Sequence, residues 1–182
     1  MTAIVSVFWR ICIFKGGPDT LPANTTLLAL IIVANALTSI VASSFLQSLL
    51  PAIPDTENMD VAIVSDSLSL LTGVVVTQAS TAGLVGLILM LMGHSSRLYQ
   101  TLTAIFGTDI ILTIVSAAAI FLVTLINTIV IQVVFLGTFF WNAAVLGFIL
   151  HKALEISRGL GIAAAVFILI FTIAITQVTL ST

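Results

Sequence analysis

The sequence predicts an all-α, polytopic membrane protein: a bundle of five transmembrane helices with the N-terminus in the cytosol and the C-terminus outside. Of the 182 residues, 60% are apolar and only 7% are charged, whereas about a quarter of the residues of an average soluble domain are charged. A compact soluble domain of this length needs a polar surface that so few charges cannot supply. The surplus apolar surface is therefore expected to face lipid.

Long charge-free runs are the second observation behind this fold class. A spanning helix needs about 20 apolar residues. The runs that meet this requirement are Thr20–Pro54, Ser67–Ser96, Ile110–Leu150 and Gly159–Thr182. As one helix, residues 110–150 would extend about 60 Å, twice the thickness of the hydrocarbon core. This run is expected to form a hairpin that turns near residues 127–132, where Asn127, Thr128 and Gln132 interrupt the apolar sequence.

The positions of the basic residues are the third observation. With five spans, every Lys and Arg falls on the same side of the membrane, at Arg10, Lys15, Arg97, Lys152 and Arg158. Short cytoplasmic loops collect Lys and Arg, so this side is assigned to the cytosol. If residues 110–150 crossed only once, Lys152 and Arg158 would lie outside and the asymmetry would be lost.

The predicted spans follow from these runs in order. They are Thr26–Leu50, Ser67–Met92, Thr108–Ile126, Gln132–Leu150 and Leu160–Val178. Residues 1–25 are a cytoplasmic interfacial leader, residues 26–178 the five-helix transmembrane domain, and residues 179–182 a short exterior tail. Residues 51–66 form an acidic exterior loop. The first span is too long for the 7 to 15 apolar residues of a cleaved signal peptide, so the N-terminus is expected to stay attached.

The leader is expected to form a short helix in the headgroup layer, because its apolar residues are followed closely by Arg10 and Lys15. Trp9 would anchor this helix at the membrane interface. Cys12 is the chain's single cysteine, and we expect it to be a small apolar residue of this segment.

Asp109 directly follows Gly107 and Thr108, where the third span is expected to start. A carboxylate at a helix N-terminus is stabilised by the exposed amides and the helix dipole, so capping is the favoured interpretation. A proton-relay role is the alternative, because carboxylates deep in a membrane are usually functional. Asp66 at the start of the second span has the same explanation, capping of a helix N-terminus.

Other polar residues lie in or near the spans, and hydrogen bonding between helices is their default role, at about 0.6 to 2 kcal/mol each. They are Asn35, Gln78, Asn127, Gln132, Asn142 and Gln177. The two histidines are expected at cytoplasmic ends of spans, and Glu155 follows His151 by one helical turn. These three side chains would hold a metal only if separate segments converged, and no HExxH or CxxC spacing supports this. Hydrated interfacial histidines are the favoured interpretation.

Several functional classes have no signature in this chain. No basic cluster provides a footprint for nucleic acid. No nucleophile array, phosphate-binding glycine loop or dinucleotide fingerprint is present, so we predict no enzyme, catalytic residue, cofactor or bound metal. The candidate functional polar residues are Asp66, Asp109, Asn127, Gln132, Asn142, His94 and His151.

Three stretches resemble the Yip family of five-span membrane proteins, especially its small bacterial members of unknown activity. They are FKGGPDTLP at residues 14–22, QTLTAIFGTD at residues 100–109 and WNAAVLGFILHKALE at residues 141–155. The resemblance implies a compact helical bundle in a bacterial inner membrane, without recognised catalytic residues. Eukaryotic relatives bind small GTPases through a longer cytosolic N-terminal domain, which this chain lacks, so that role does not carry over.

Two functions from different classes are therefore expected. The first is a non-enzymatic interaction or assembly role, with membrane lipids, other membrane proteins or a second copy of the chain as partners. The alternative is a small transporter or channel subunit in which Asp66, Asp109, Asn127, Gln132 and Asn142 lie near a hydrated path. A metal or cofactor carrier that uses His94 and His151 is a third and weaker option.

Overall fold

The computed structural model describes residues 2–49, 67–124 and 128–181, and in these residues the regular elements are all helices. In chain order they are α1 (Thr2–Cys12), η1 (Pro18–Thr20), α2 (Thr25–Leu49), α3 (Ser67–Leu91), η4 (Ser95–Arg97), α4 (Leu98–Thr124), α5 (Thr128–Leu154) and α6 (Arg158–Ser181). In the described part of the chain, five helices, α2 to α6, are long and apolar enough to cross a membrane. The all-α fold with five candidate spans is confirmed, and the protein is a multi-pass helical membrane protein.

The helix bounds agree with the predicted spans except around the hairpin. α2, α3 and α6 begin and end within about three residues of the expected positions. α4 begins at Leu98 instead of Thr108, and α5 begins at Thr128 instead of Gln132. The turn was expected near residues 127–132. Its predicted position is wrong for residues 128–132, because these residues already belong to α5. Residue 127 and the acidic loop 51–66 lie outside the described residues.

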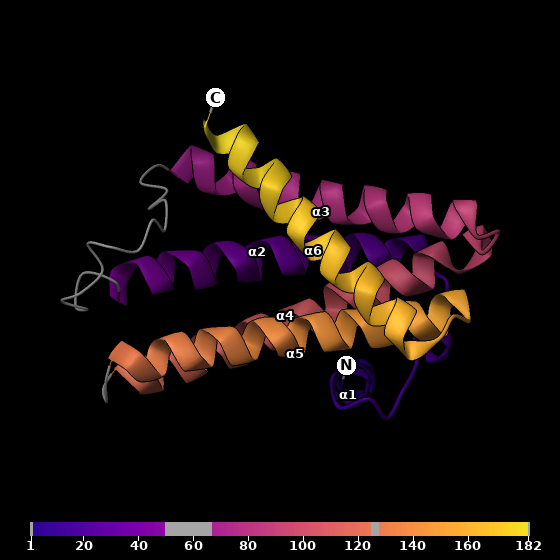
Figure 1. The fold of residues 1–182 in the computed structure, drawn as a ribbon, viewed down its shortest axis with the longest axis horizontal. Coiled ribbons are helices and arrows are strands. Elements are labelled where there is room, and N and C mark those ends of the chain that lie inside the picture. The colour runs from indigo at the N-terminus through magenta and orange to yellow at the C-terminus, as the bar shows by residue number, and fades with distance from the viewer. Residues whose placement is uncertain (1, 50–66, 125–127, 182) are drawn as a thin grey trace.

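Figure 1 shows how the helices are arranged. α2, α3, α4 and α5 run across the view, whereas α6 crosses obliquely, from α5 at one end of the bundle to α3 at the other. α1 is seen nearly end-on beside α4 and α5. Figure 1 also shows the α3–α4 and α5–α6 connections at the same end of the bundle. We call this the basic end, because Arg97, Lys152 and Arg158 lie there. Its assignment to the cytosol stays a prediction.

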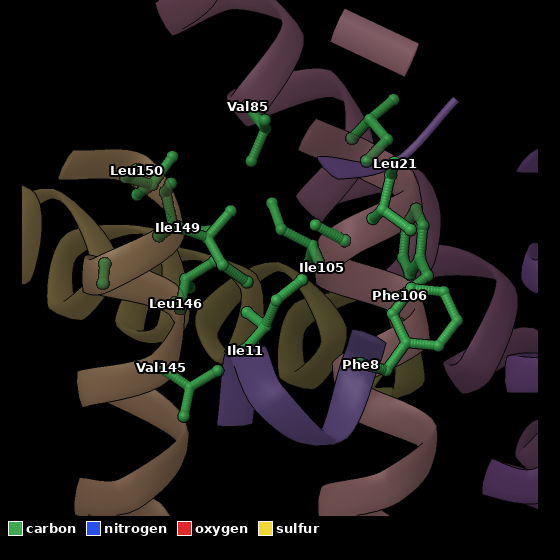
Figure 2. Close-up of a cluster of buried hydrophobic side chains, with 14 of the residues drawn as sticks. Phe8, Ile11, Leu21, Val85, Ile105, Phe106, Val145, Leu146, Ile149 and Leu150 are labelled. Carbon is green, nitrogen blue, oxygen red and sulfur yellow. The ribbon is translucent and has the colours of Figure 1, made fainter. Parts of the chain in front are cut away.

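The hydrophobic core lies in the half of the bundle next to the basic end. Ile11, Val85, Leu89, Ile149 and Leu150 are each fully buried. Figure 2 shows Phe8 and Ile11 of α1 pointing toward side chains of α4 and α5, among them Ile105, Phe106 and Leu146. All residues from 101 to 108 of α4 are buried, so protein surrounds this part of the helix. Its buried Thr101 and Thr103 hydroxyls donate to carbonyls one turn earlier, which satisfies them.

Polar contacts close the basic end. The Arg97 guanidinium of η4 forms an ion pair with Glu155 at 2.7 Å and donates to the Ala153 carbonyl at 3.3 Å, which joins η4 to the end of α5 and the residue after it. The Gln100 amide donates to the Leu21 carbonyl at 2.9 Å. α3 ends at Leu91. Gly93, two residues later, has a φ of 74°, the left-handed conformation that glycine adopts most easily, and the His94 amide then donates back to the Leu89 carbonyl.

The leader helix expected from the sequence is confirmed as α1, and much of its apolar side is covered by protein. Phe8, Ile11 and Cys12 are buried, whereas Trp9 is 46% exposed and remains available as an interface anchor. Gly107 makes room for Phe8, because a Cβ atom at this glycine would lie 2.3 Å from the Phe8 ring. The Trp141 indole donates to the Cys12 carbonyl at 3.2 Å. α1 is therefore docked on α4 and α5 by both packing and a hydrogen bond.

Candidate intramembrane polar site

Asp109 lies in the middle third of α4 and does not cap it. The helix begins at Leu98, so Asp109 follows the first residue by about 16 Å along the axis. The capping interpretation of Asp109 is therefore wrong. It failed because the polar sequence before Gly107 resembles an interfacial loop, although these residues continue the helix inside the protein. A carboxylate at this depth is, by default, a functional candidate.

Two amides from neighbouring helices hold the Asp109 carboxylate. Asn35 of α2 donates from Nδ2 to Oδ2 at 3.1 Å, and Asn142 of α5 donates from Nδ2 to Oδ1 at 3.5 Å. The Ser39 hydroxyl in turn donates to the side-chain oxygen Oδ1 of Asn35 at 3.5 Å. Only 1% of the Asn35 surface is exposed. Three spans therefore meet at one carboxylate through side chains that are separated by 33 and 74 residues along the chain.

These three residues lie at nearly the same depth. Asn35 follows the start of α2 by about 15 Å, and Asn142 precedes the end of α5 by about 18 Å, both measured along the helix axes from the basic end. Asp109 lies between these two values. The polar cluster is therefore close to the middle of the spanning helices, which are about 37 to 40 Å long.

A cavity of about 400 Å³ adjoins the cluster and is lined by all five spanning helices. It extends from the Asp109 carboxylate toward the end opposite the basic end, past Ser39 and Ser43 of α2. The polar residues that line it on the other helices include Ser69, Thr77, Gln78, Thr81, Asn142 and Thr172. Aliphatic side chains such as Val74, Leu146 and Ile168 complete the wall. In size and mixed lining it matches sites that bind small molecules.

Two polar atoms of the lining have no hydrogen-bond partner among the described residues. They are the Gln78 amide nitrogen on α3 and the Thr172 hydroxyl on α6, and both atoms are buried. Thr172 as a whole is only 5% exposed. Buried polar groups are nearly always hydrogen-bonded, because an unpaired one costs about 1 to 3 kcal/mol. The two groups therefore indicate that a polar occupant, solute or water, belongs in the cavity.

The cavity lining carries charge of one sign only among its described residues. In the part of the chain that the structure describes, the lining contains the Asp109 carboxylate but no Lys, Arg or His. The Glu155 carboxylate follows α5 at the basic end, where it pairs with Arg97, and it does not line the cavity. The carboxylate is therefore available to a positively charged ligand.

The other candidate residues do not join this cluster. Gln132 is exposed on α5 and is not part of the cavity lining, whereas Asp66 and Asn127 lie outside the described residues. The His94 ring donates from Nδ1 to the Met92 carbonyl, and the His151 ring contacts the Ile156 carbonyl. Within the described ranges, no group of three or more His, Cys, Asp or Glu side chains is placed to hold a metal ion.

The sequence pattern alone predicts a helix-packing role for Asn35 and does not group it with Asp109. The signal that could have grouped them is their shared depth in the membrane. Asn35, Asp109 and Asn142 each lie about ten to twelve residues from the basic end of their helices. This count needs the true start of α4, which the sequence pattern placed ten residues too late.

Comparison of the chain with protein-family models, with curated protein sequences and with solved structures gave no match. The resemblance to the Yip family and the inner-membrane location that it implies therefore stay predictions.

Proposed function

We propose that the protein is a small transporter, or a subunit of one, that binds a small organic cation at Asp109. The observation that carries this proposal is a carboxylate in the middle of the spanning helices, held by Asn35 and Asn142 and facing a cavity without a basic side chain among its described residues. An uncompensated charge is costly in a membrane, and carboxylates retained there usually serve ion or solute pathways.

The chemistry of the lining supports an organic cation over an anion or a bare metal ion. Asp109 would repel an anion, because the described lining has no positive group to offset it. A cavity of about 400 Å³ is much larger than one dehydrated metal ion needs. Hydroxyl and amide groups such as those of Thr172 and Gln78 would bond to polar hydrogens or oxygens of the solute, and aliphatic walls would cover its carbon atoms.

The route into the cavity follows from the packing. At the basic end, the core around Leu89 and Leu150 fills the space between the helices. In the other direction Ser39, Ser43 and Ser69 continue the polar lining. We infer that the solute enters from the end opposite the basic end, and that release on the other side requires rearrangement of the packed half.

The assembly role expected first from the sequence stays a prediction, as does the expectation that the protein is not an enzyme. Neither depends on the polar cavity. The transporter proposal is preferred here because it accounts for Asp109 and for both unpaired polar groups with one ligand.

The test is binding and uptake by the purified protein in proteoliposomes, with radiolabelled methylammonium and tetraethylammonium as probes. Asp109→Asn is expected to lower probe affinity by about tenfold or more, because a hydrogen bond to a charged partner contributes about 1.5 to 3 kcal/mol. Asp19→Asn is the matched control, since Asp19 is an exposed carboxylate of η1 and does not line the cavity. Saturable uptake that Asp109→Asn leaves unchanged, or no saturable binding of either probe, would contradict the proposal.

A further inference from the structure

A second cavity, of about 370 Å³, lies between α5 and α6 near the basic end. Gly147 and Phe148 of α5 and Ile162 of α6 contribute an apolar wall, and Phe14, from the turn that follows α1, closes one side. His151 and Arg158 line the same cavity. It shares no lining residue with the polar cavity at Asp109.

The apolar part of this cavity is built by glycines and aromatic rings. Gly147 and Gly161 let α5 and α6 approach closely, since a Cβ atom at Gly161 would lie 2.5 Å from the Gly147 carbonyl oxygen. Phe14 has a φ of 60°, a left-handed conformation that is unusual for a bulky residue. In this conformation its ring packs edge-on against Phe148, with 5.5 Å between the ring centroids. The ring remains 46% exposed.

The polar part of the cavity is cationic. Arg158 is exposed, and no hydrogen bond or ion pair of its side chain with another described residue is found. The nearby Glu155 carboxylate is paired with Arg97 at 2.7 Å. The Nδ1 atom of His151 donates to the Ile156 carbonyl, so Nε2 is the ring atom left for a ligand, and it donates to a phosphate oxygen when the ring is the imidazolium.

The surrounding charge has the same sign. On α1, on the turn after it and at the basic end, the described residues include the five basic residues of the chain but only two carboxylates, Asp19 and Glu155, which is a net charge of 5 − 2 = +3. A cationic group at the end of an apolar groove between two spanning helices is the arrangement that binds an acidic headgroup together with its acyl chain.

We propose that this cavity binds one anionic phospholipid. Its phosphate lies against Arg158 and His151, and an acyl chain lies along Gly147, Phe148 and Ile162. Charge complementarity selects an acidic lipid over a zwitterionic one, because the zwitterionic headgroup brings its own cation to the same place. The site is separate from the proposed solute site and does not depend on it.

The test uses delipidated protein in detergent, to which dioleoylphosphatidylglycerol or dioleoylphosphatidylcholine is added at equal molar concentration, with lipid adducts counted by native mass spectrometry. The wild type is expected to bind the acidic lipid about fivefold more than the zwitterionic one, and Arg158→Gln should remove most of this preference. Arg10→Gln is the matched control, because Arg10 is exposed on α1 and outside the cavity. It should keep the preference.

Further variants and probes separate this site from general electrostatic attraction. Ala144→Leu adds bulk to the groove without changing charge and should lower binding of both lipids. Melting temperatures without lipid show whether each variant is folded. The proposal is overturned by equal binding of the two lipids, by equal losses in Arg10→Gln and Arg158→Gln, or by inorganic phosphate that displaces the acidic lipid at equal concentration.

Discussion

The two halves of the bundle differ in what fills the space between their helices. Next to the basic end, buried side chains such as Phe8, Leu89 and Ile149 meet in a continuous core, and α1 adds a further layer. In the other half, Ser43, Ser69 and other small or polar residues border a cavity. Packing among helices in lipid depends on close contact and hydrogen bonds more than on hydrophobicity. The packed half can therefore set the helix positions, which leaves the open half free to keep unpaired polar groups.

The largest effect is expected at the close crossing of α5 and α6 in the packed half. Gly161→Leu places side-chain atoms against the Gly147 carbonyl and the His151 Cβ atom, 2.5 and 3.0 Å from the new Cβ position. A backbone carbonyl cannot move aside, so α5 and α6 must separate, at a cost of about 3 kcal/mol. Unfolding in urea or in mixed micelles measures this loss.

Gly137→Leu is the control for this variant, because a Cβ atom there meets nothing within 4 Å. It should leave stability within about 0.5 kcal/mol of the wild type. Equal stability of the two variants would mean that the close α5–α6 crossing does not hold the bundle together.

A smaller loss is expected when α1 is detached from the packed half. Phe8→Ala removes the ring that fills the space above Gly107, and about 2 kcal/mol of docking free energy should be lost, less than in a water-soluble core because detergent can cover the exposed surface. The spans should stay folded, since α1 lies outside them.

Cys12 reports this detachment directly. Burial raises the pKa of the Cys12 thiol to about 11, and only the thiolate reacts with iodoacetamide. In wild type, the alkylation rate at pH 8 should be low and should rise about tenfold per pH unit until the pH nears 11. Undocking should bring the pKa back toward its ordinary value of 9.0 and raise the rate at pH 8 by roughly 90-fold. Val5→Ala is the control, because Val5 is 59% exposed; a rate in Phe8→Ala no higher than in Val5→Ala would show that α1 stays docked.

The sequence predicts the packed half and the spans better than it predicts the polar site. Long apolar runs, together with basic residues that all lie on one side of the membrane, indicate which solvent surrounds each helix. Lipid acts on each segment separately, so this signal can be found segment by segment. For this reason α2, α3 and α6 were placed within a few residues of their true ends. α1 was recognised as an amphipathic helix on the same basis, although its partner surface on α4 was not.

The polar site depends on contacts that single segments do not reveal. Asp109 can continue a helix in the membrane because Asn35 and Asn142 bond to it from two other spans. Without these partners a carboxylate in the sequence is more simply interpreted as a helix terminus, and α4 was accordingly started too late. The hydrogen bonds that overturn this interpretation join residues 33 and 74 positions apart, so they follow from the packing of the helices and not from local sequence.

The smallest effect on stability, and the sharpest comparison of the halves, is expected from one substitution made in each half. Thr172→Val replaces a buried hydroxyl that has no partner among the described residues by a methyl group of similar size. Removal of an unpaired polar group should leave the free energy of unfolding unchanged or raise it by up to about 1 kcal/mol. Thr103→Val in the packed half removes a hydroxyl bonded to the Tyr99 carbonyl at 2.7 Å and should lower it by about 0.5 to 1 kcal/mol.

The probe-binding assay separates a functional hydroxyl from an idle one. If Thr172 meets the solute, Thr172→Val should lower affinity for the organic cation about fivefold while the protein stays as stable as the wild type. Thr103→Val should leave affinity unchanged, because Thr103 does not line the cavity. Loss of stability of the same size in both variants would show that the Thr172 hydroxyl is paired in the folded protein. The open half would then be held together by the same kind of contacts as the packed half.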